Sequence, residues 1–263
     1  MKINNQVANA SLNTLQQAQQ KQSEQLASGK RINRAADDAA GLLIANRLSS
    51  DINATTQGQR NLYDGIGLAQ VYEQNLSNIS TSVMEMQQLS VAAGNGAYSD
   101  ADKQALQQQY ESKAQEIQAT IDNASFAGQP LFDGNSVQFN TGGSFTALKT
   151  GDVAAELTTQ NVFSADLSTQ AGAAAAADSS KNALAYLDQL RSEAGAAING
   201  FASQARNLNN QQVNVSQARS GIQDADYAKT SSDKTATDIL AKASVSVALQ
   251  ARISQQQALN LLS

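Results

Sequence analysis

Histidine, cysteine and tryptophan are all absent from this chain of 263 residues, and it contains a single proline. Without cysteine the chain can form no disulfide, thiolate nucleophile or cysteine-rich metal site. Without histidine it lacks the commonest general base and the commonest zinc ligand. These absences disfavour most catalytic and metal-dependent functions, so we expect neither an enzyme nor a cofactor.

Long apolar runs and dense positive charge are also missing. The opening residues MKINNQVANA lack the apolar segment of a secretory signal, and no stretch approaches the roughly 20 apolar residues that span a bilayer. The net charge is −5, and the 18 basic residues form no long run or dense stripe. We therefore predict no nucleic-acid partner and no membrane partner.

What the chain has in abundance is apolar residues, many of them alanine, at helical spacing. Hydrophobic residues make up 41% of the chain but aromatic residues only 5%, which favours long, thin helix contacts over a thick globular core. Apolar positions separated alternately by four and three residues are typical of coiled coils. The predicted fold is mainly α: an elongated antiparallel coiled-coil rod with a small β-hairpin and terminal helices that pack in a polymer.

Two long segments are predicted to build the rod. Residues 46–93 and 179–222 carry the alternating pattern over many turns, and their matching lengths predict that they pack together. Between them, Ser99 followed by Asp102 predicts the start of a shorter helix, antiparallel to its predecessor. The residues that we expect to pack in the rod are Leu48, Ile52, Leu62, Ile66, Leu187, Leu190, Phe201, Leu208 and Val215.

Residues 126–178 differ in character from the rod, because they hold the proline and many of the glycines. Apolar and polar residues alternate on both sides of Gly142-Gly143, which predicts a β-hairpin. We expect residues 152–170 to be irregular or to add short strands. The alanine run at 171–178 is expected to lead into the next helix through high helix propensity alone.

Both ends of the chain carry weaker apolar stripes. The stripe of residues 1–29 is narrow and interrupted by amides, so we expect this helix to be marginal alone. Residues 236–263 mirror it with a wider apolar face, both ends carry apolar surface that they cannot bury well alone, and polar segments join them to the rod. One of these segments, residues 30–45, is consistent with a joint or with a solvated helix face. Ends that need partners suit open-ended assembly from many copies. The residues predicted to make the self-assembly contacts are Ala8, Leu12, Leu15, Leu26, Leu240, Ala243, Val247, Ala251 and Leu262.

The polar segments also contain paired carboxylates, Asp37-Asp38 and Asp224 with Asp226. Such pairs can bind a cation or act as acid and base, but we favour solvated joints and helix capping. Together the patterns predict five parts of the chain. These are an N-terminal assembly helix with its joint (1–45), the N-terminal rod helices (46–125), the β-hairpin with a short variable region (126–178), the C-terminal rod helix (179–222), and a joint with the C-terminal assembly helix (223–263).

Three segments resemble bacterial flagellin. Residues 26–69, which begin LASGKRINRAADDAAGLLIANRLSS, resemble its N-terminal region, and ARSGIQDADYA at 218–228 resembles its C-terminal counterpart. FAGQPLFDG at 126–134 resembles the turn that follows the short helix in that family. The resemblance implies a structural subunit that self-assembles into the helical filament of the bacterial flagellum for swimming or swarming motility. The short middle implies little or no variable outer domain.

The resemblance also implies a location and partners. The subunit is expected to leave the cell through the flagellar type III export channel and to end in the extracellular filament. Expected partners are other copies of the chain, a filament cap, junction proteins, and an export chaperone that binds around residues 236–263.

One departure from the family concerns an innate immune receptor. Many flagellins carry an arginine-rich helix segment that a Toll-like receptor binds, and the matching stretch here is SVMEMQQLSVAAGNG. Glu85 and Gln87 stand where that pattern has arginines, whereas Leu89 and Glu116 match it. Because reversed charge at a buried interface contact is unfavourable, we expect weak receptor activation.

Two other functions are weighed beside the filament subunit. A hook–filament junction protein resembles flagellin at both ends but forms only a short ring. A soluble coiled-coil adaptor or secreted effector would keep its assembly state when either end was deleted. The match of FAGQPLFDG together with the hairpin favours the filament subunit over the junction protein.

Overall fold

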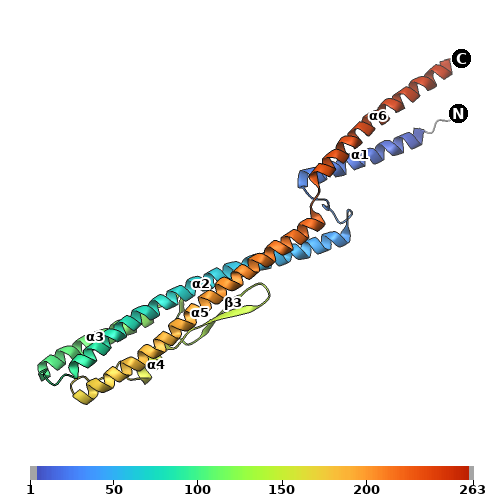
Figure 1. Ribbon diagram of the computed structural model, residues 1–263. Helices are drawn as coiled ribbons and strands as arrows, with labels where there is room; N and C mark the ends of the chain where they lie inside the picture. Colours follow the sequence, from blue (N-terminus) through green and yellow to red (C-terminus); the bar gives the residue numbers. More distant parts are fainter. Residues whose placement is uncertain (1–4, 261–263) are drawn as a thin grey trace. The chain divides into compact units, whose positions relative to one another are not determined.

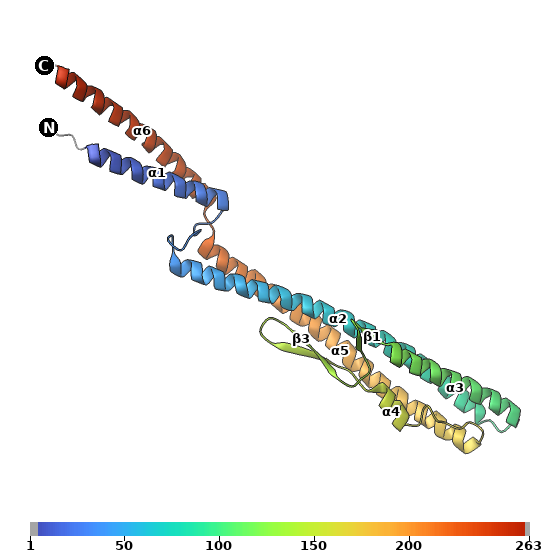
Figure 2. The same cartoon turned by 180° about the vertical axis from the view of Figure 1, so that it is seen from behind.

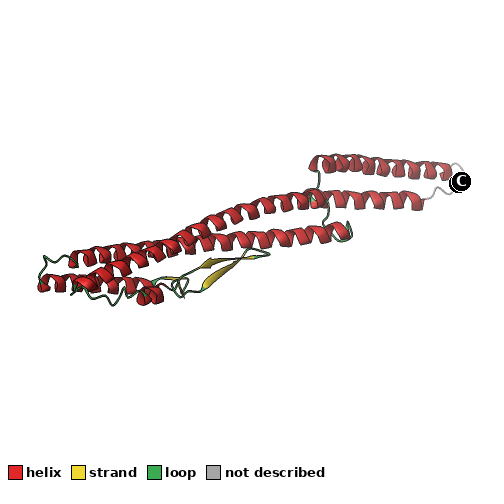
Figure 3. Ribbon diagram, turned by 60° about the horizontal axis from the view of Figure 1, so that its bottom comes forward, coloured by secondary structure: helices red, strands yellow, loops and turns green. Residues whose placement is uncertain are grey.

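The computed structural model of the chain describes residues 5–260, most of them in helices (Figure 3). It divides into two compact units. The first contains both ends of the chain, up to Ile52 and from Val213 onward, and the second is Asn53–Gln212. We call them the end unit and the rod unit. The long helices α2 (Ala39–Ala93) and α5 (Gln170–Gln223) contribute residues to both, and the mainly α fold predicted from the sequence is confirmed.

In the rod unit, α2 and α5 lie side by side, with α3 (Asp100–Asn123) beside α2 (Figures 1 and 2). Arg191 Nη2 of α5 lies 3.1 Å from Glu73 Oε1 of α2, and Gln212 Nε2 donates to Thr56 Oγ1 at 3.2 Å. Residue numbers therefore rise along one helix as they fall along the other. This is the antiparallel pairing of long helices that the matching apolar patterns predicted.

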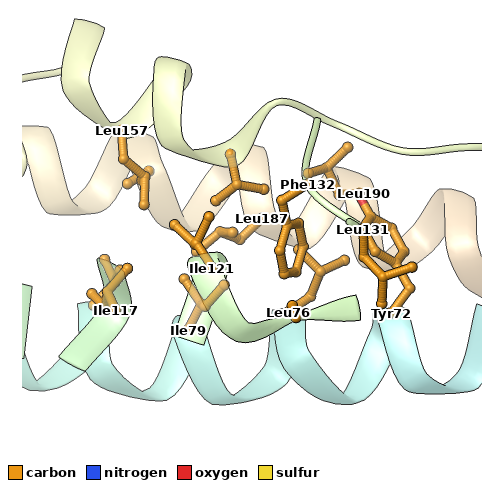
Figure 4. Close-up of a cluster of buried hydrophobic side chains, with 14 of the residues drawn as sticks. Tyr72, Leu76, Ile79, Ile117, Ile121, Leu131, Phe132, Leu157, Leu187 and Leu190 are labelled. Carbon is orange, nitrogen blue, oxygen red and sulfur yellow. The ribbon is translucent and has the colours of Figure 1, made fainter. Parts of the chain in front are cut away.

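The core of the rod unit is formed by leucine, isoleucine and aromatic side chains from several elements. Figure 4 shows Leu76 of α2, Ile121 of α3 and Leu187 of α5 converging with Phe132 of the segment after α3. Burying each such side chain contributes roughly 1.5–3 kcal/mol. Of the expected rod-packing residues in this unit, those that are buried are Leu62, Leu187, Leu190 and Phe201, and those that are half-buried are Ile66 and Leu208.

The turn between α2 and α3 ends in the helix start that the sequence predicted. Ser99 Oγ accepts from the Asp102 backbone N–H at 3.3 Å, and Asp102 Oδ2 accepts from the Ser99 N–H at 3.0 Å. Each side chain thus satisfies a backbone donor that the helix leaves without a partner. The hydrogen bonds from Ser99 lower the pKa of Asp102.

A β-hairpin follows α3, as expected from the alternation of apolar and polar residues. Strands β3 (Ser136–Asn140) and β4 (Phe145–Lys149) pair antiparallel, in a register that runs from Ser136↔Lys149 to Asn140↔Phe145. Before it, the short strands β1 (Ser125–Phe126) and β2 (Gln129–Pro130) form a tight turn. This turn is the FAGQPLFDG segment.

Residues 152–170, expected to be irregular or to add short strands, contain a helix that the sequence did not predict, whereas residues 160–169 are irregular as expected. Residues Val153–Thr159 form helix α4, with the Asp152 side chain accepting from the Ala155 backbone N–H at its start. Val153 and Leu157 are four residues apart, so they share one face of the helix, and both are fully buried. Two apolar residues in so short a segment give too weak a period to reveal a helix.

Three long helices begin earlier than the sequence pattern indicated. Helix α2 begins at Ala39 rather than 46, and α5 begins at Gln170 rather than 179. The alanine run is therefore inside α5, where Ala173 and Ala176 pack in the core, so it contributes specific contacts as well as helix propensity. Helix α6 (Tyr227–Asn260) likewise takes in most of the polar segment expected to be a joint.

Candidate assembly surfaces

In the end unit, α1 (Asn5–Ser28) and α6 lie side by side (Figures 1 and 2) and meet through polar side chains. Gln19 Nε2 donates to Asp238 Oδ1 at 2.8 Å, and Gln22 Nε2 donates to Thr237 Oγ1 at 3.2 Å. The Gln22 Oε1 atom is buried without a hydrogen-bond partner, which is unfavourable. The expected N-terminal assembly residues Leu12, Leu15 and Leu26 are all half-buried.

Helix α6 leaves a wide apolar surface uncovered in the single chain. Leu240 is 57% exposed and Val247 is 68% exposed, and Ala243 is also exposed. Of the expected C-terminal assembly residues that the structure describes, Ala251 is half-buried. Leu262 and the side chain of Ala8 lie outside the described residues. We name the large exposed side chains the α6 apolar surface: Ile239, Leu240, Val245, Val247, Leu249 and Ile253.

The two polar segments that join the ends to the long helices are hydrogen-bonded to each other. The Arg31 backbone N–H donates to the Gln223 carbonyl at 2.7 Å, and Arg31 Nη2 donates to the Ile222 carbonyl at 2.7 Å. The Ala225 N–H donates to the Gly29 carbonyl at 3.0 Å. Arg31 thus satisfies carbonyls at the end of α5 that have no partner within the helix, where positive charge is also favourable. The sequence pattern gave no sign of this pairing.

Asp37 fixes the N-terminal joint. Its Oδ1 lies 2.8 Å from Lys21 Nζ of α1, and its Oδ2 accepts from the backbone N–H groups of Asn33 and Arg34. The hydrogen bond from Lys21, followed by those from the backbone, lowers the pKa of Asp37 to about 2. The carboxylate therefore favours the folded joint only while it is charged.

Of the other paired carboxylates, Asp224 accepts from Ser220 Oγ at the end of α5 at 2.6 Å, and Asp38 and Asp226 act at helix starts. Asp38 Oδ1 accepts from the Gly41 N–H at 2.8 Å, and Asp226 Oδ1 accepts from the Lys229 N–H at 3.0 Å. Both are caps for the first turns of α2 and α6. Across residues 5–260, no group of three or more acidic side chains is placed to hold a metal ion.

The stretch of α2 that the resemblance related to a receptor site takes part in a three-residue ion cluster with α3. Lys113 Nζ lies 2.8 Å from Glu116 Oε2 and 2.9 Å from Glu85 Oε2. Both carboxylates, Glu116 first, raise the pKa of Lys113. Gln87 and Leu89 are half-buried on the same stretch of α2. The structure thus brings Glu85 and Glu116 together, through a lysine that the sequence reading did not single out.

Among the described residues, no helix combines the length and apolar character needed to cross a bilayer.

Comparisons with known proteins agree with these features. The family described as the bacterial flagellin N-terminal helical region matches residues 2–137, and the bacterial flagellin C-terminal helical region matches residues 177–262. The chain belongs to the bacterial flagellin family. It is 33% identical to a flagellin of Halalkalibacterium halodurans over 248 residues, which is 92% of this chain and 91% of that protein. A flagellin of similar length supports the expectation of a short form with little outer domain.

Two solved structures share the fold. A crystal structure of Bacillus cereus flagellin superimposes with a TM-score of 0.52 at 22% identity, over 57% of this chain and 88% of that one. A putative flagellar hook-associated protein from Vibrio parahaemolyticus gives a TM-score of 0.61 at 14% identity, over 72% of this chain and all of the other. Membership of the flagellin family makes the chain a structural subunit of the flagellar filament and not an enzyme.

Proposed function

We propose that copies of this chain join into the filament mainly through the α6 apolar surface. Helix α1 lies beside α6 and is hydrogen-bonded to it through Gln19 and Gln22, and we call this contact the polar seam. The observation that carries this proposal is the exposure of six large apolar side chains on one helix of the single chain. An exposed apolar surface of this extent is typical of an interaction site. The polar seam with α1 leaves that surface free for other copies.

The test removes apolar area without touching the polar seam. In the double variant Leu240→Ser with Val247→Ser, the monomer should keep its helix content because both side chains are exposed. The critical concentration for polymerisation, measured by sedimentation, should rise by on the order of 100-fold, because two apolar contacts are lost.

The matched control replaces two exposed polar residues of the same helix, in Gln250→Ser with Gln257→Ser. This control should polymerise like the unaltered chain. Equal critical concentrations for the two double variants would refute the proposed surface.

The route and the partners at the ends of the filament follow from the family. We propose export through the flagellar type III channel, with a chaperone covering the α6 apolar surface before polymerisation, and with cap and junction proteins at the filament ends. A chaperone bound there should protect α6 amides from exchange and lose affinity in the Leu240→Ser, Val247→Ser variant. Undiminished affinity in that variant would place the chaperone elsewhere.

We also propose that this chain activates the innate immune receptor weakly. Glu85 supplies negative charge where the family pattern has an arginine, and Lys113 holds it together with Glu116. A receptor built for arginine would meet an ion cluster that it must break. Reporter cells should respond weakly to the chain and more strongly to Glu85→Arg with Gln87→Arg, and a strong response to the unaltered chain would contradict the proposal.

The alternative considered from the sequence is a junction protein between hook and filament, and the likeness to a hook-associated protein, at 14% identity, bears on the fold alone. Electron microscopy of polymerised pure protein separates the two candidates. Long filaments exclude the junction role, whereas short rings that never elongate exclude the filament role.

A further inference from the structure

The tip of the β3–β4 hairpin approaches α2 so closely that backbone meets backbone. A Cβ atom placed on Gly58 of α2 would lie 2.5 Å from the carbonyl carbon and oxygen of Thr141 at the tip. From the other side, a Cβ on Gly142 would lie 2.7 Å from the Ala54 carbonyl oxygen. Separations below 3.0 Å are essentially never seen for a real Cβ. The tip fits against α2 only because neither glycine has a side chain.

Further contacts continue along the same face of α2. Asn61 Nδ2 donates to the Asn140 carbonyl at 2.7 Å. One turn later, the Phe139 ring lies 3.3 Å from where a Cβ of Gly65 would be, and its centroid lies 5.6 Å from that of Phe201 on α5. The residues of α2 that contact the hairpin lie three or four positions apart, so they share one face of the helix. We name this face the hairpin seat: Ala54, Gly58, Asn61 and Gly65.

The seated hairpin covers the rod where α3 does not. Helix α3 contributes Ile117 and Ile121 to the core. The hairpin contributes Phe139, and Phe201 beneath it is only 2% exposed. Without the hairpin, Phe201 would lose the aromatic ring that packs against it.

We propose that Gly58 is the positioning residue that sets the hairpin on the rod, and that the seated hairpin is the third wall of the core beside α2 and α5. Helix propensity alone favours alanine at position 58, because glycine is a poor helix former. An alanine there would nonetheless push Thr141 away and lift Phe139 from Phe201. The contact with the hairpin tip therefore favours glycine at position 58, whereas helix propensity favours alanine.

A matched pair of substitutions in α2 tests this proposal. Gly67 lies in the same helix with nothing within 4 Å of its Cβ position, so Gly67→Ala adds helix propensity without a clash. In native-state hydrogen exchange of the full chain, Gly58→Ala should speed exchange of the β3 and β4 amides by about tenfold or more. Gly67→Ala should leave them equally or better protected. Equal hairpin protection in the two variants would overturn the proposal.

A shortened hairpin keeps the test decisive if Gly58→Ala does not fold. Replacing residues 140–145 by a two-residue Asn-Gly turn retains the Phe139↔Thr146 pair and removes the tip. In that background Gly58→Ala should raise the thermal midpoint, as Gly67→Ala does, because nothing remains for the new Cβ to meet. A loss of stability in both backgrounds would place the defect inside α2 and refute the tip contact.

Gly142 offers the same comparison from the other side. Gly142→Ala meets the Ala54 carbonyl and also has an unfavourable φ of +87°, whereas Gly143→Ala has open space. Only Gly142→Ala should expose the hairpin amides to exchange, and equal exchange in the two would count against the seat. All of these measurements use the monomer, so a failure of the chain to polymerise would leave their outcome unaffected.

Discussion

The rod unit and the end unit use the same helical period but are stabilised by different chemistry. The rod unit buries leucine, isoleucine and aromatic side chains along its length. Among the described residues of the end unit, the fully buried hydrophobic ones are Ile32 and Ala45. The hydrogen bonds between α1 and α6 join amides to a carboxylate and a hydroxyl, and the leucines of α1 are only half-buried. A helical repeat therefore predicts which face packs but not how strongly.

The difference matters for assembly because the two kinds of contact differ in strength. A buried leucine contributes roughly 1.5–3 kcal/mol, whereas a typical hydrogen bond contributes about 0.5–1.5 kcal/mol net. The rod unit can be stable in a single chain. The end unit is the part of the molecule that gains most from added partners, and its apolar surface on α6 is still uncovered.

The largest expected effect comes from deleting one core side chain of the rod unit. Leu187 is fully buried among α2, α3 and α5, so Leu187→Ala should lower the free energy of unfolding by about 2–5 kcal/mol through lost burial and a cavity. Leu240→Ala, on an exposed face of α6, should change it by less than about 0.5 kcal/mol. Denaturant unfolding of the monomer followed by circular dichroism compares them, and similar losses would refute the contrast between the units.

A smaller effect of opposite sign is expected when the polar seam is made apolar. Gln22→Leu removes the buried oxygen without a partner and adds apolar area between α1 and α6, so it should stabilise their pairing by about 1 kcal/mol. Gln20, on an exposed face of α1, supplies the control Gln20→Leu. Amide exchange in α1 should slow only in Gln22→Leu. Faster amide exchange in α1 of Gln22→Leu would show that losing the hydrogen bond to Thr237 costs more than is gained by removing the unpartnered Gln22 oxygen.

A third comparison concerns the ion cluster on the rod unit. Lys113→Met removes both ion pairs to Glu85 and Glu116, and it should cost about 0.5 kcal/mol or less because the charges are largely exposed. The loss should shrink further in high salt, since screening weakens exposed pairs. Thermal unfolding at low and high salt measures this, and a loss that is unchanged by salt would indicate a packing role for the lysine stem.

Sequence reasoning predicted the long helices and the hairpin because each has a repeated period. The spacing of apolar residues by four and three predicted α2 and α5, and the alternation of apolar and polar residues predicted β3 and β4. It misplaced the helix starts because capping by Asp38 and Asp226 depends on a single side chain and leaves no repeat.

The assembly surfaces were harder to predict than the fold. Alternation of four and three placed Leu240 and Val247 in the stripe of α6, but the structure turns the Thr237 side of the helix toward α1. The hydrogen bonds from Gln22 to Thr237 and from Gln19 to Asp238 are consistent with this orientation of α6 about its axis. A pattern of hydrophobic residues does not predict such hydrogen bonds. The joints pair through backbone carbonyls, which accept from backbone N–H groups and from the Arg31 side chain, so apolar patterns could not show the pairing.

The most local effect is expected from acid at the N-terminal joint. The pKa of Asp37 falls from its ordinary value of 3.8 to about 2 in the folded chain. The charged carboxylate therefore stabilises the joint fully above about pH 4, and this contribution is lost as the pH falls through 2. Asp37→Asn should accordingly weaken the joint at neutral pH and match the unaltered chain near pH 2.

Amide exchange of α1, corrected for the intrinsic effect of pH, measures that convergence. Asp64→Asn, at an exposed position of α2, supplies a control that should follow the unaltered chain at every pH. If the difference between Asp37→Asn and the unaltered chain stayed constant from pH 4 to pH 2, the charge on Asp37 would not be what holds the joint. The stability of the end unit would then have to be attributed to hydrogen bonds that do not titrate, such as the one between Gln22 and Thr237.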